Sequence, residues 1–188
     1  KIMLLVPAGN PVDSMIDRLL PLLDYGDLII DGGNSHFDDT ERRFKFLESK
    51  KINFIGAGVS GGSKGARCGP SIMPGGNKKS YLKIKSIFES VAAKVGNVPC
   101  VMYLGKSSSG HYVKMIHNGI EYAMMQLISE SYDLLRKGFK KNNDEIQKIF
   151  SKWNSGILNS YLIEITKEIF SKKDMETNNY MIDVILDK

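Results

Sequence analysis

Short apolar runs and longer amphipathic stretches alternate along the first part of the chain. Four apolar runs are short enough for buried strands, at residues 2–6, 27–31, 52–55 and 98–104. Apolar residues at helical spacing predict helices between these runs, at residues 11–23, 38–50 and 78–91. Because strands and helices alternate, the pattern favours an α/β layer with a largely parallel sheet.

The pattern changes after residue 105. A long helical stretch covers residues 111–137 and contains one glycine, Gly119. Two further helical stretches are expected at residues 143–153 and 155–172. The sheet region is therefore expected to end near residue 105, and an all-helical region is expected to follow it.

Composition indicates an ordinary globular chain. Of its 188 residues, 42% are apolar and 25% are charged. No apolar run approaches the ~20 residues that span a bilayer, and the apolar run at the start is too short for a signal peptide. The sequence begins with Lys1 rather than Met, inside an expected strand. We therefore expect it to be a piece of a longer protein.

The cysteines and histidines do not predict a disulfide framework or a zinc site. Cys68 and Cys100 are too few for a framework, and neither belongs to a CxxC pair. Both are expected to be reduced, as in a cytosolic protein. The histidines, His36, His111 and His117, lack HExxH spacing, so no metal is expected.

An acid-free stretch carries much of the positive charge. The formal net charge is +5, and no Asp or Glu occurs from Ser49 to Phe88. The basic residues of this stretch are Lys50, Lys51, Lys64, Arg67, Lys78, Lys79, Lys83 and Lys85. Such a stretch favours an anionic partner: a phosphorylated metabolite, a nucleotide or a nucleic acid. A solvated face of a lysine-rich protein is an equally good explanation.

A glycine-rich segment covers residues 56–76. Its first six residues fit G-x-G-x-x-G, which by itself suggests a dinucleotide-binding fingerprint. That fingerprint opens directly into a helix and has an acidic residue about 20 positions later. Here glycines and prolines continue through the segment, and the next acidic residue is Glu89. We therefore do not interpret the segment as that fingerprint.

Part of the same segment suits an anion. Ser60, Gly61 and Gly62 offer a hydroxyl and consecutive backbone N–H groups without side-chain obstruction. Lys64 and Arg67 stand close by in the sequence and could pair with a carboxylate or phosphate. The alternative is an irregular loop that needs glycine only for its turns.

The long helical stretch carries four different polar groups on one side. Lys114, His117, Asn118 and Glu121 lie at i, i+3, i+4 and i+7, which share a helix face at about 100° per residue. A base, an imidazole, an amide and an acid in one stripe suit general acid–base catalysis on a polar substrate. A solvated lysine and a structural histidine are the alternatives.

The same stretch has an apolar side and an unexpected glycine. The apolar side consists of Val113, Ile116, Ile120, Met124, Leu127 and Ile128. Gly119 costs a helix up to ~1 kcal/mol against Ala, so close approach of another group at this position would explain it.

Six segments occur in a specific combination and order: Asp31-Gly32-Gly33-Asn34-Ser35, Gly58-Val59-Ser60-Gly61-Gly62, Gly65-Ala66-Arg67, residues 69–76, residues 114–122 and Leu162-Ile163-Glu164-Ile165-Thr166. In this order they resemble the decarboxylating 6-phosphogluconate dehydrogenases of the pentose phosphate pathway. The resemblance extends over essentially the whole chain, and the combination of motifs is highly specific.

The resemblance implies that NADP oxidises 6-phosphogluconate to ribulose 5-phosphate and carbon dioxide, without a metal. Lys114 matches the base that removes the C3 hydroxyl proton while hydride leaves C3 for the nicotinamide. The 3-keto intermediate then loses carbon dioxide, and Glu121 matches the acid that protonates the resulting enediol at C1. A lysine must be neutral to accept a proton, which burial or neighbouring cations favour.

Further positions match binding residues of the family. Those that match substrate contacts are Ser60, Gly61, Gly62, His117, Asn118 and Tyr122. Asn34 matches a residue that touches both substrate and cofactor, and Val6, Pro7 and Ala8 match a loop that lines the cofactor.

The resemblance also sets the expected domains. Residues 1–105 would form an N-terminally truncated, Rossmann-like dinucleotide-binding domain, and residues 106–188 the first part of an all-helical substrate and dimerisation domain. The family usually has lysine at Pro7, and its fingerprint strand and C-terminal part have no counterpart in this sequence. We expect a cytoplasmic homodimeric parent enzyme, and little or no activity from these 188 residues alone.

Three alternatives are weaker. A 3-hydroxyisobutyrate-type dehydrogenase shares the Ser-Gly-Gly loop and the helix lysine, but residues 31–35 and 117–122 favour the decarboxylating enzyme. A nucleic-acid module needs stacking aromatics, and the basic stretch offers only Phe54, Tyr81 and Phe88. We therefore expect neither a nucleic-acid nor a membrane partner. A piece that serves only dimerisation is the third alternative.

Overall fold

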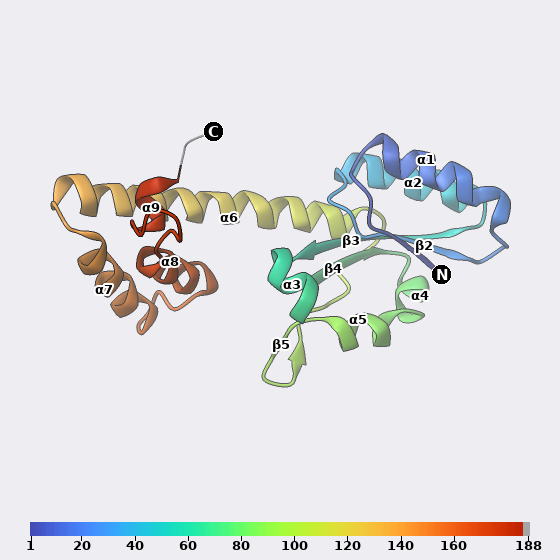
Figure 1. The fold of residues 1–188 in the computed structure, drawn as a ribbon. Coiled ribbons are helices and arrows are strands. Elements are labelled where there is room, and N and C mark those ends of the chain that lie inside the picture. Colours follow the sequence, from blue (N-terminus) through green and yellow to red (C-terminus); the bar gives the residue numbers. More distant parts are fainter. Residues whose placement is uncertain (186–188) are drawn as a thin grey trace. The chain divides into compact units, whose positions relative to one another are not determined.

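The computed structural model describes residues 1–185 and divides into two compact units. The first unit is Lys1–Gly119, and the second begins at Ile120. An α/β unit followed by a helical unit confirms the expected fold class (Figure 1).

A four-stranded sheet forms the centre of the first unit. The order is β1 (Ile2–Leu4), β2 (Leu28–Asp31), β3 (Asn53–Ser60) and β4 (Ser71–Gly76). The first three strands run parallel, with Leu4 opposite Asp31 and Asp31 opposite Gly56. The fourth strand runs antiparallel to β3. The sheet is therefore largely parallel, as the alternating pattern predicts.

Helices cover both faces of this sheet (Figure 1). One face packs against α1 (Asn10–Leu19) and α2 (Phe37–Ser49), and the other against α4 (Lys78–Leu82) and α5 (Lys85–Val91). Successive strand residues point to opposite faces. The core under α1 and α2 consists of Leu4, Val12, Ile16, Ile29, Leu47, Ile52 and Phe54. The core under α4 and α5 consists of Leu28, Ile30, Ile55, Ala57, Ile72, Tyr81, Ile84, Phe88 and Ala92.

Three expected elements of the first unit differ from the structure. The glycine-rich segment contains the end of β3, then α3 (Gly62–Cys68), then β4. The sequence did not predict α3 and β4 because glycine has no side chain. Where backbone packs closely against backbone, no alternation of apolar and polar side chains marks the element. The helix expected over residues 78–91 is two short helices separated at Lys83 and Ile84.

The last expected strand of this unit is mostly absent. Within residues 98–104, regular strand pairing joins only β6 (Val98–Pro99) to β5 (Lys94–Val95), and Val101 makes one isolated bridge to Ile72. Pro99 lacks a backbone N–H, which limits the extension of the strand there.

Helix α6 (Ser109–Asp133) begins in the first unit and continues into the second. It ends in the π-helical turn η2 (Leu134–Gly138), beyond which lie α7 (Asn143–Asn154), α8 (Tyr161–Ser171) and α9 (Met181–Val184). The core of the second unit joins α7 and α8 through Ile146, Phe150, Ile163 and Phe170.

Local signals explain where the helices of the second unit begin. Asn142 and Glu145 form a reciprocal capping box at the start of α7. The Ser160 hydroxyl accepts a hydrogen bond from the Ile163 backbone N–H at the start of α8. Residues 155–160, expected to be helical, therefore form the connection between α7 and α8.

Candidate functional site

The candidate site begins where the parallel strands end. The carboxyl ends of β1, β2 and β3 meet at one edge of the sheet, where open α/β sheets bind ligands. The loops after β1 and β2 lie side by side there, because a Cβ added at Gly33 would be 3.0 Å from the Val6 carbonyl oxygen. The structure thus brings Val6, Pro7 and Ala8 together with the segment of Asn34. Pro7, Ala8 and Asn34 are exposed.

Glycines allow the first turns of α6 to lie directly on the β3–β4 hairpin. A Cβ added at Gly58 would overlap the Cβ of Lys114. A Cβ added at Gly110 would overlap the carbonyl oxygens of Gly56 and Met73. Side chains at these positions would push the helix away from the strands, so the glycines fix the height of α6 above the sheet.

This close packing buries the candidate base. Lys114 is 8% exposed, and its aliphatic stem lies against Gly58 near the carboxyl end of β3. His117 and Asn118 are half-buried on the next turn of α6. The structure therefore places the side chain of Lys114 in a protein environment at the edge where the parallel strands end.

The stripe continues along α6 into the second unit. Glu121 is half-buried and Tyr122 is exposed. Glu121 is seven positions after Lys114, about two helical turns, so both lie on one side of α6. The apolar side is not a buried core within the described residues: Ile116 is 42% exposed and Ile120 is 58% exposed.

The described residues do not themselves make the close approach expected at Gly119. Apart from its chain neighbours and the backbone of α6, none of residues 1–185 lies within 4 Å of a Cβ added there. The close approach on α6 occurs instead at Gly110, which faces the strand backbone.

The candidate anion-binding segment joins β3 to α3. Ser60 is the last residue of β3, and α3 begins at Gly62. Gly61 has a φ of 138° and Gly62 a φ of 55°, which favour glycine because L side chains are strained there. Lys64 and Arg67 are exposed on α3.

One of the two arguments against the dinucleotide fingerprint is wrong. The loop after β3 does open directly into a helix, α3. The strand β4 that follows this helix, however, runs antiparallel to β3, whereas the fingerprint belongs to a parallel βαβ unit. The missing acidic residue also argues against the fingerprint, since the next one is Glu89.

A buried guanidinium near this edge was not predicted from the sequence. Arg43 is 1% exposed and makes a two-pronged ion pair with Asp13, at 2.9 Å from Nε to Oδ1 and 3.0 Å from Nη2 to Oδ2. Arg43 Nη2 also donates to the Gly9 carbonyl at 3.0 Å, and Nη1 donates to Ser35 Oγ at 3.2 Å. Arg43 Nη1 lies 3.6 Å from Asp31 Oδ2. The bonds from the guanidinium to Asp13 hold the pKa of that carboxyl at about 2.

A buried imidazole lies close to this group. His111 is 1% exposed, and its Nδ1 is 2.6 Å from Thr40 Oγ1. Burial lowers the pKa of His111, which favours a neutral ring. The spacing of Thr40, Arg43 and Leu47 (i, i+3, i+7) is the sequence signal that places Arg43 on the buried face of α2.

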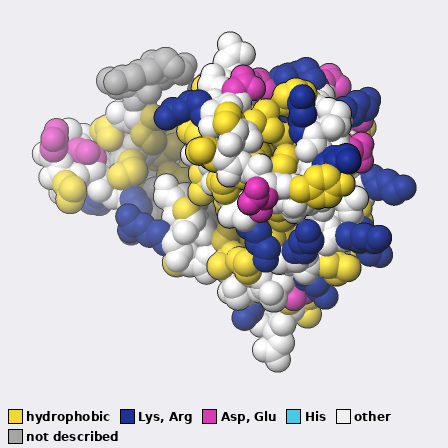
Figure 2. Space-filling model, turned by 90° about the vertical axis from the view of Figure 1, so that its right-hand side faces the viewer, with side chains coloured by type: hydrophobic (Ala, Val, Ile, Leu, Met, Phe, Trp, Pro, Cys, Tyr) yellow, Lys and Arg dark blue, Asp and Glu magenta, His cyan; other side chains and the backbone are white. Residues whose placement is uncertain are grey.

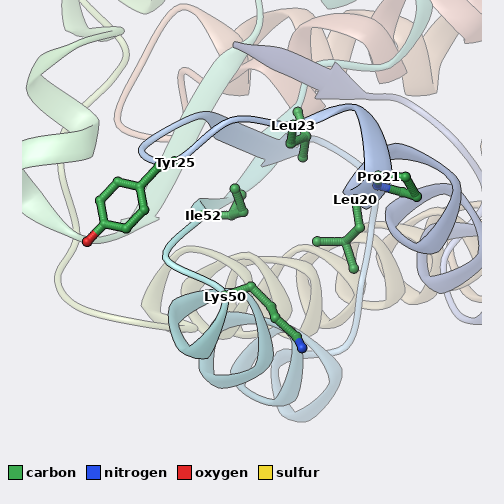
Figure 3. A pocket seen from close by; sticks show the side chains of 6 residues that line it. All are labelled: Leu20, Pro21, Leu23, Tyr25, Lys50 and Ile52. Carbon is green, nitrogen blue, oxygen red and sulfur yellow. The ribbon is translucent and has the colours of Figure 1, made fainter.

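Other surface features lie away from this edge. A shallow hollow of about 420 Å³ is lined by Leu20, Pro21, Leu23, Tyr25, Lys50 and Ile52 (Figure 3). Its residues precede β2 and β3, so it lies at the amino ends of those strands, opposite the candidate site. On the face shown in Figure 2, Lys and Arg side chains are interspersed with apolar and acidic ones.

Neither a metal centre nor a membrane span is found in the described part of the chain. Residues 1–185 contain no group of three or more His, Cys, Asp or Glu side chains that could hold a metal ion. Over the same residues, no helix combines the length and apolar character needed to cross a membrane.

Two family models together match almost the whole chain. Residues 1–105 match the NAD binding domain of 6-phosphogluconate dehydrogenase, and residues 110–188 match the 6-phosphogluconate dehydrogenase C-terminal domain. The fold is thus an α/β unit of the class found in NAD-binding domains, followed by a helical unit. The chain belongs to the 6-phosphogluconate dehydrogenase family, which confirms the resemblance carried by its motifs.

Curated relatives support the same family. The chain is 58% identical over 190 residues to the decarboxylating 6-phosphogluconate dehydrogenase of Lactococcus lactis subsp. cremoris. It is 56% identical to the NAD(+)-dependent and 54% identical to the NADP(+)-dependent decarboxylating enzyme of Bacillus subtilis. These matches cover 100% of this chain but 40% of each relative, so the chain spans less than half the length of these proteins.

Solved structures agree with the fold. The 6-phosphogluconate dehydrogenase of Plasmodium falciparum, studied as apo form and with NADP+ or 6-phosphogluconate, is 54% identical with a TM-score of 0.93. That match covers 98% of this chain and 40% of the other. The 3-hydroxyisobutyrate dehydrogenase of Mycobacterium tuberculosis matches at a TM-score of 0.71 over 85% of this chain and 52% of its own. At 22% identity it shares the fold alone.

Proposed function

We propose that this chain carries the catalytic centre of an enzyme that oxidises and decarboxylates 6-phosphogluconate to ribulose 5-phosphate with a nicotinamide dinucleotide. The observation that carries the proposal is the burial of Lys114 at the carboxyl ends of the parallel strands. There Gly58 and Gly110 let α6 lie directly against strand residues, a contact that we call the glycine seat. That edge is where this type of sheet binds nucleotides and their substrates. The names of the relatives supply the substrate class.

Lys114 and Glu121 have separate roles in this proposal. Lys114 acts as the general base and takes the proton of the C3 hydroxyl. The bound dinucleotide supplies the hydride acceptor. After carbon dioxide leaves, Glu121 donates a proton to C1 of the enediol, two turns further along the same side of α6.

The remaining predicted residues bind and orient. Ser60, Gly61 and Gly62 offer hydroxyl and backbone donors to substrate oxygens, and His117, Asn118 and Tyr122 add contacts from α6. Residues 6–8 and Asn34 would hold the dinucleotide. Their place at the carboxyl ends of β1 and β2, and the exposure of Pro7, Ala8 and Asn34, support this role.

We propose NADP rather than NAD as the dinucleotide, as the family resemblance implies. Both types occur among relatives of similar identity in Bacillus subtilis. A comparison of kcat/KM for the two dinucleotides tests this choice directly. A higher value with NAD would overturn the NADP assignment and leave the rest of the proposal intact.

The test of the proposed function uses the full-length protein. We expect 6-phosphogluconate-dependent reduction of the dinucleotide with one carbon dioxide released per turnover. Lys114→Met keeps the length of the side chain but removes the base, so kcat should fall at least ~1,000-fold, the scale of general-base catalysis with a positioned group. Lys64→Met, which removes an exposed lysine on α3, is the matched control. The kcat of Lys64→Met should be at least tenfold higher than the kcat of Lys114→Met.

Two results would overturn the proposed function. One is a folded full-length protein that gives no turnover with 6-phosphogluconate and either dinucleotide. The other is full activity in Lys114→Met. We further propose that residues 1–188 alone are inactive or very weak, that the full-length protein is a homodimer, and that it is cytoplasmic. Assay of the isolated chain and sedimentation across concentrations test the first two.

A further inference from the structure

We propose that Arg43 is a positioning residue that clamps the loop after β1 to the loop after β2 and thereby sets the affinity for both the dinucleotide and the sugar acid. The inference rests on the proposed function, because residues 6–8 and Asn34 take their binding roles from it. It adds a role for a side chain that lies on α2, outside every segment proposed to touch a ligand.

The guanidinium joins the two loops directly. Arg43 Nη2 donates to the Gly9 carbonyl at 3.0 Å, one residue beyond the proposed dinucleotide loop at residues 6–8. Arg43 Nη1 donates to Ser35 Oγ at 3.2 Å, one residue beyond Asn34. One rigid, planar group therefore fixes the distance between two segments that lie 26 positions apart in the sequence, counted from Gly9 to Ser35.

Asn34 is held from both sides although it is itself exposed. On one side, Ser35 Oγ donates to Asp31 Oδ2 at 2.6 Å. On the other, the Gly33 backbone N–H donates to Asp31 Oδ1 at 3.0 Å. Arg43 Nη1 stands 3.6 Å from the same carboxylate, which accepts both of these bonds.

Stability alone is a poor reason for this arrangement. Arg43 is 1% exposed and Asp31 is 0% exposed, and burying an ion pair removes most of its hydration. Apolar side chains of similar volume often stabilise such a position as well or better. A guanidinium offers instead fixed directions to several acceptors, which is what holding two loops in register requires.

Arg42 provides a matched control within the same helix. It pairs with the same carboxylate, with its Nη2 at 3.0 Å from Asp13 Oδ2, and it also bonds Asp39. The Arg42 side chain is 57% exposed. Its bond to Asp13 joins α2 to α1 and its bond to Asp39 lies within α2, so neither bond reaches the two loops.

The experiment compares Arg43→Gln, Arg43→Lys and Arg42→Gln in the full-length protein. For Arg43→Gln we expect the KM for both the dinucleotide and 6-phosphogluconate to rise at least ~10-fold, the scale of a lost charged hydrogen bond. We expect kcat to change less than ~3-fold, because the glycine contacts at Gly58 and Gly110 seat Lys114 independently of the clamp. Arg43→Lys should recover part of the affinity, and Arg42→Gln should change either KM less than ~2-fold.

A direct binding measurement separates this inference from the proposed function. Dissociation constants for NADP and NAD are measured by calorimetry on the same variants, and melting temperatures are recorded beside them. If the wild-type protein binds dinucleotide but does not turn over 6-phosphogluconate, the proposed function fails, and the ratio of dissociation constants between wild type and Arg43→Gln still decides the clamp.

Three outcomes would overturn the clamp. One is a lower melting temperature for Arg43→Gln with both KM values and the dissociation constant unchanged, which would make Arg43 purely structural. A second is equal effects from Arg42→Gln and Arg43→Gln. If Arg43→Gln does not fold, Ser35→Ala replaces it: this variant removes one arm of the clamp and should raise both KM values ~3-fold or more. Unchanged KM values in that variant are the third outcome.

Discussion

The two compact units bury different kinds of side chain. The core of the second unit is aliphatic and aromatic, with Phe150 packed edge-on against Phe170 at 5.0 Å between ring centroids. The first unit has apolar cores on both faces of its sheet, yet it also buries Arg43, His111 and Lys114 towards one edge. Buried polar groups cost free energy unless they are paired, so their concentration in one unit indicates where position matters more than stability.

The units also differ in how their backbones are packed. In the second unit, side chains keep the helices apart, and capping residues such as Asn142 and Ser160 begin α7 and α8 locally. In the first unit, Gly58 and Gly110 let a helix touch strand backbone. Contact through glycine leaves no flexible side chain to absorb a change, so this seat should tolerate substitution poorly.

The largest effect on stability is expected in the second unit. Phe150→Ala removes a fully buried ring and should lower the free energy of unfolding of the full-length protein by about 3–5 kcal/mol. Because the ring lies outside the unit that carries residues 6–8 and Asn34, the dissociation constant for dinucleotide should stay within ~2-fold of wild type. Urea unfolding and calorimetry check the two quantities. Lys152→Ala, an exposed position on the same helix, should cost less than ~0.5 kcal/mol. A large change in dinucleotide affinity with Phe150→Ala would contradict the division of labour between the units.

A substitution in the glycine seat should instead reduce catalysis more than stability. Gly58→Ala adds one methyl group that overlaps the Cβ of Lys114, so α6 must move away from β3. We expect kcat/KM to fall ~100-fold, because displacing a reacting group by about 1 Å costs on that order. Stability should fall by about 1–3 kcal/mol from overpacking.

Gly119→Ala is the matched control for this seat. It adds the same methyl group to α6 where the described residues leave open space. Replacing a helical glycine with alanine should raise stability by up to ~1 kcal/mol. Steady-state kinetics and urea unfolding of both variants measure the two effects. A smaller fall in kcat/KM with Gly58→Ala than with Gly119→Ala would show that the contact at Gly58 does not position Lys114.

The smallest effect concerns the pH dependence of the first unit. The pKa of Asp13 is about 2 against an ordinary value of 3.8, mainly because Arg43 bonds to the carboxylate. A lowered pKa means stabilisation that is fully present above about pH 4 and is lost as the pH falls towards 2. Asp13→Asn should therefore cost about 1–2 kcal/mol at pH 7, and its difference from wild type should shrink below pH 4.

Urea unfolding at a series of pH values measures this difference. Asp17→Asn, on an exposed position of the same helix, should cost less than ~0.5 kcal/mol at pH 7. A cost of Asp13→Asn that is the same at pH 7 and near pH 3 would show that the ion pair with Arg43 does not supply the stabilisation.

Patterns of side chains predicted the elements whose cores are apolar. The runs that became β1, β2 and β3 and the helical spacing of α1, α2 and α7 are visible because apolar burial imposes a period on the sequence. Helix α3 and strand β4 were missed for the same reason: glycine carries no side chain, so packing of backbone on backbone leaves no period to detect.

The candidate site was predictable only in part. The spacing of Lys114 and Glu121 follows from helix geometry, and motif resemblance supplied their proposed roles. The burial of Lys114 and the ties from Arg43 to Gly9 and Ser35 depend on contacts between distant segments, which no local period encodes.

The sequence by itself determined the family, the alternation of β1, β2 and β3 with α1 and α2, and the polar stripe on α6, because these depend on residue identity and on spacing within one element. Only the tertiary structure shows that Lys114 is buried while an apolar neighbour on α6, Ile120, is exposed. Only the tertiary structure shows that Arg43 is the buried side chain between the loops after β1 and β2. The physical reason is that burial is a property of the surroundings: a side chain loses its water only when segments far away in the sequence fold against it.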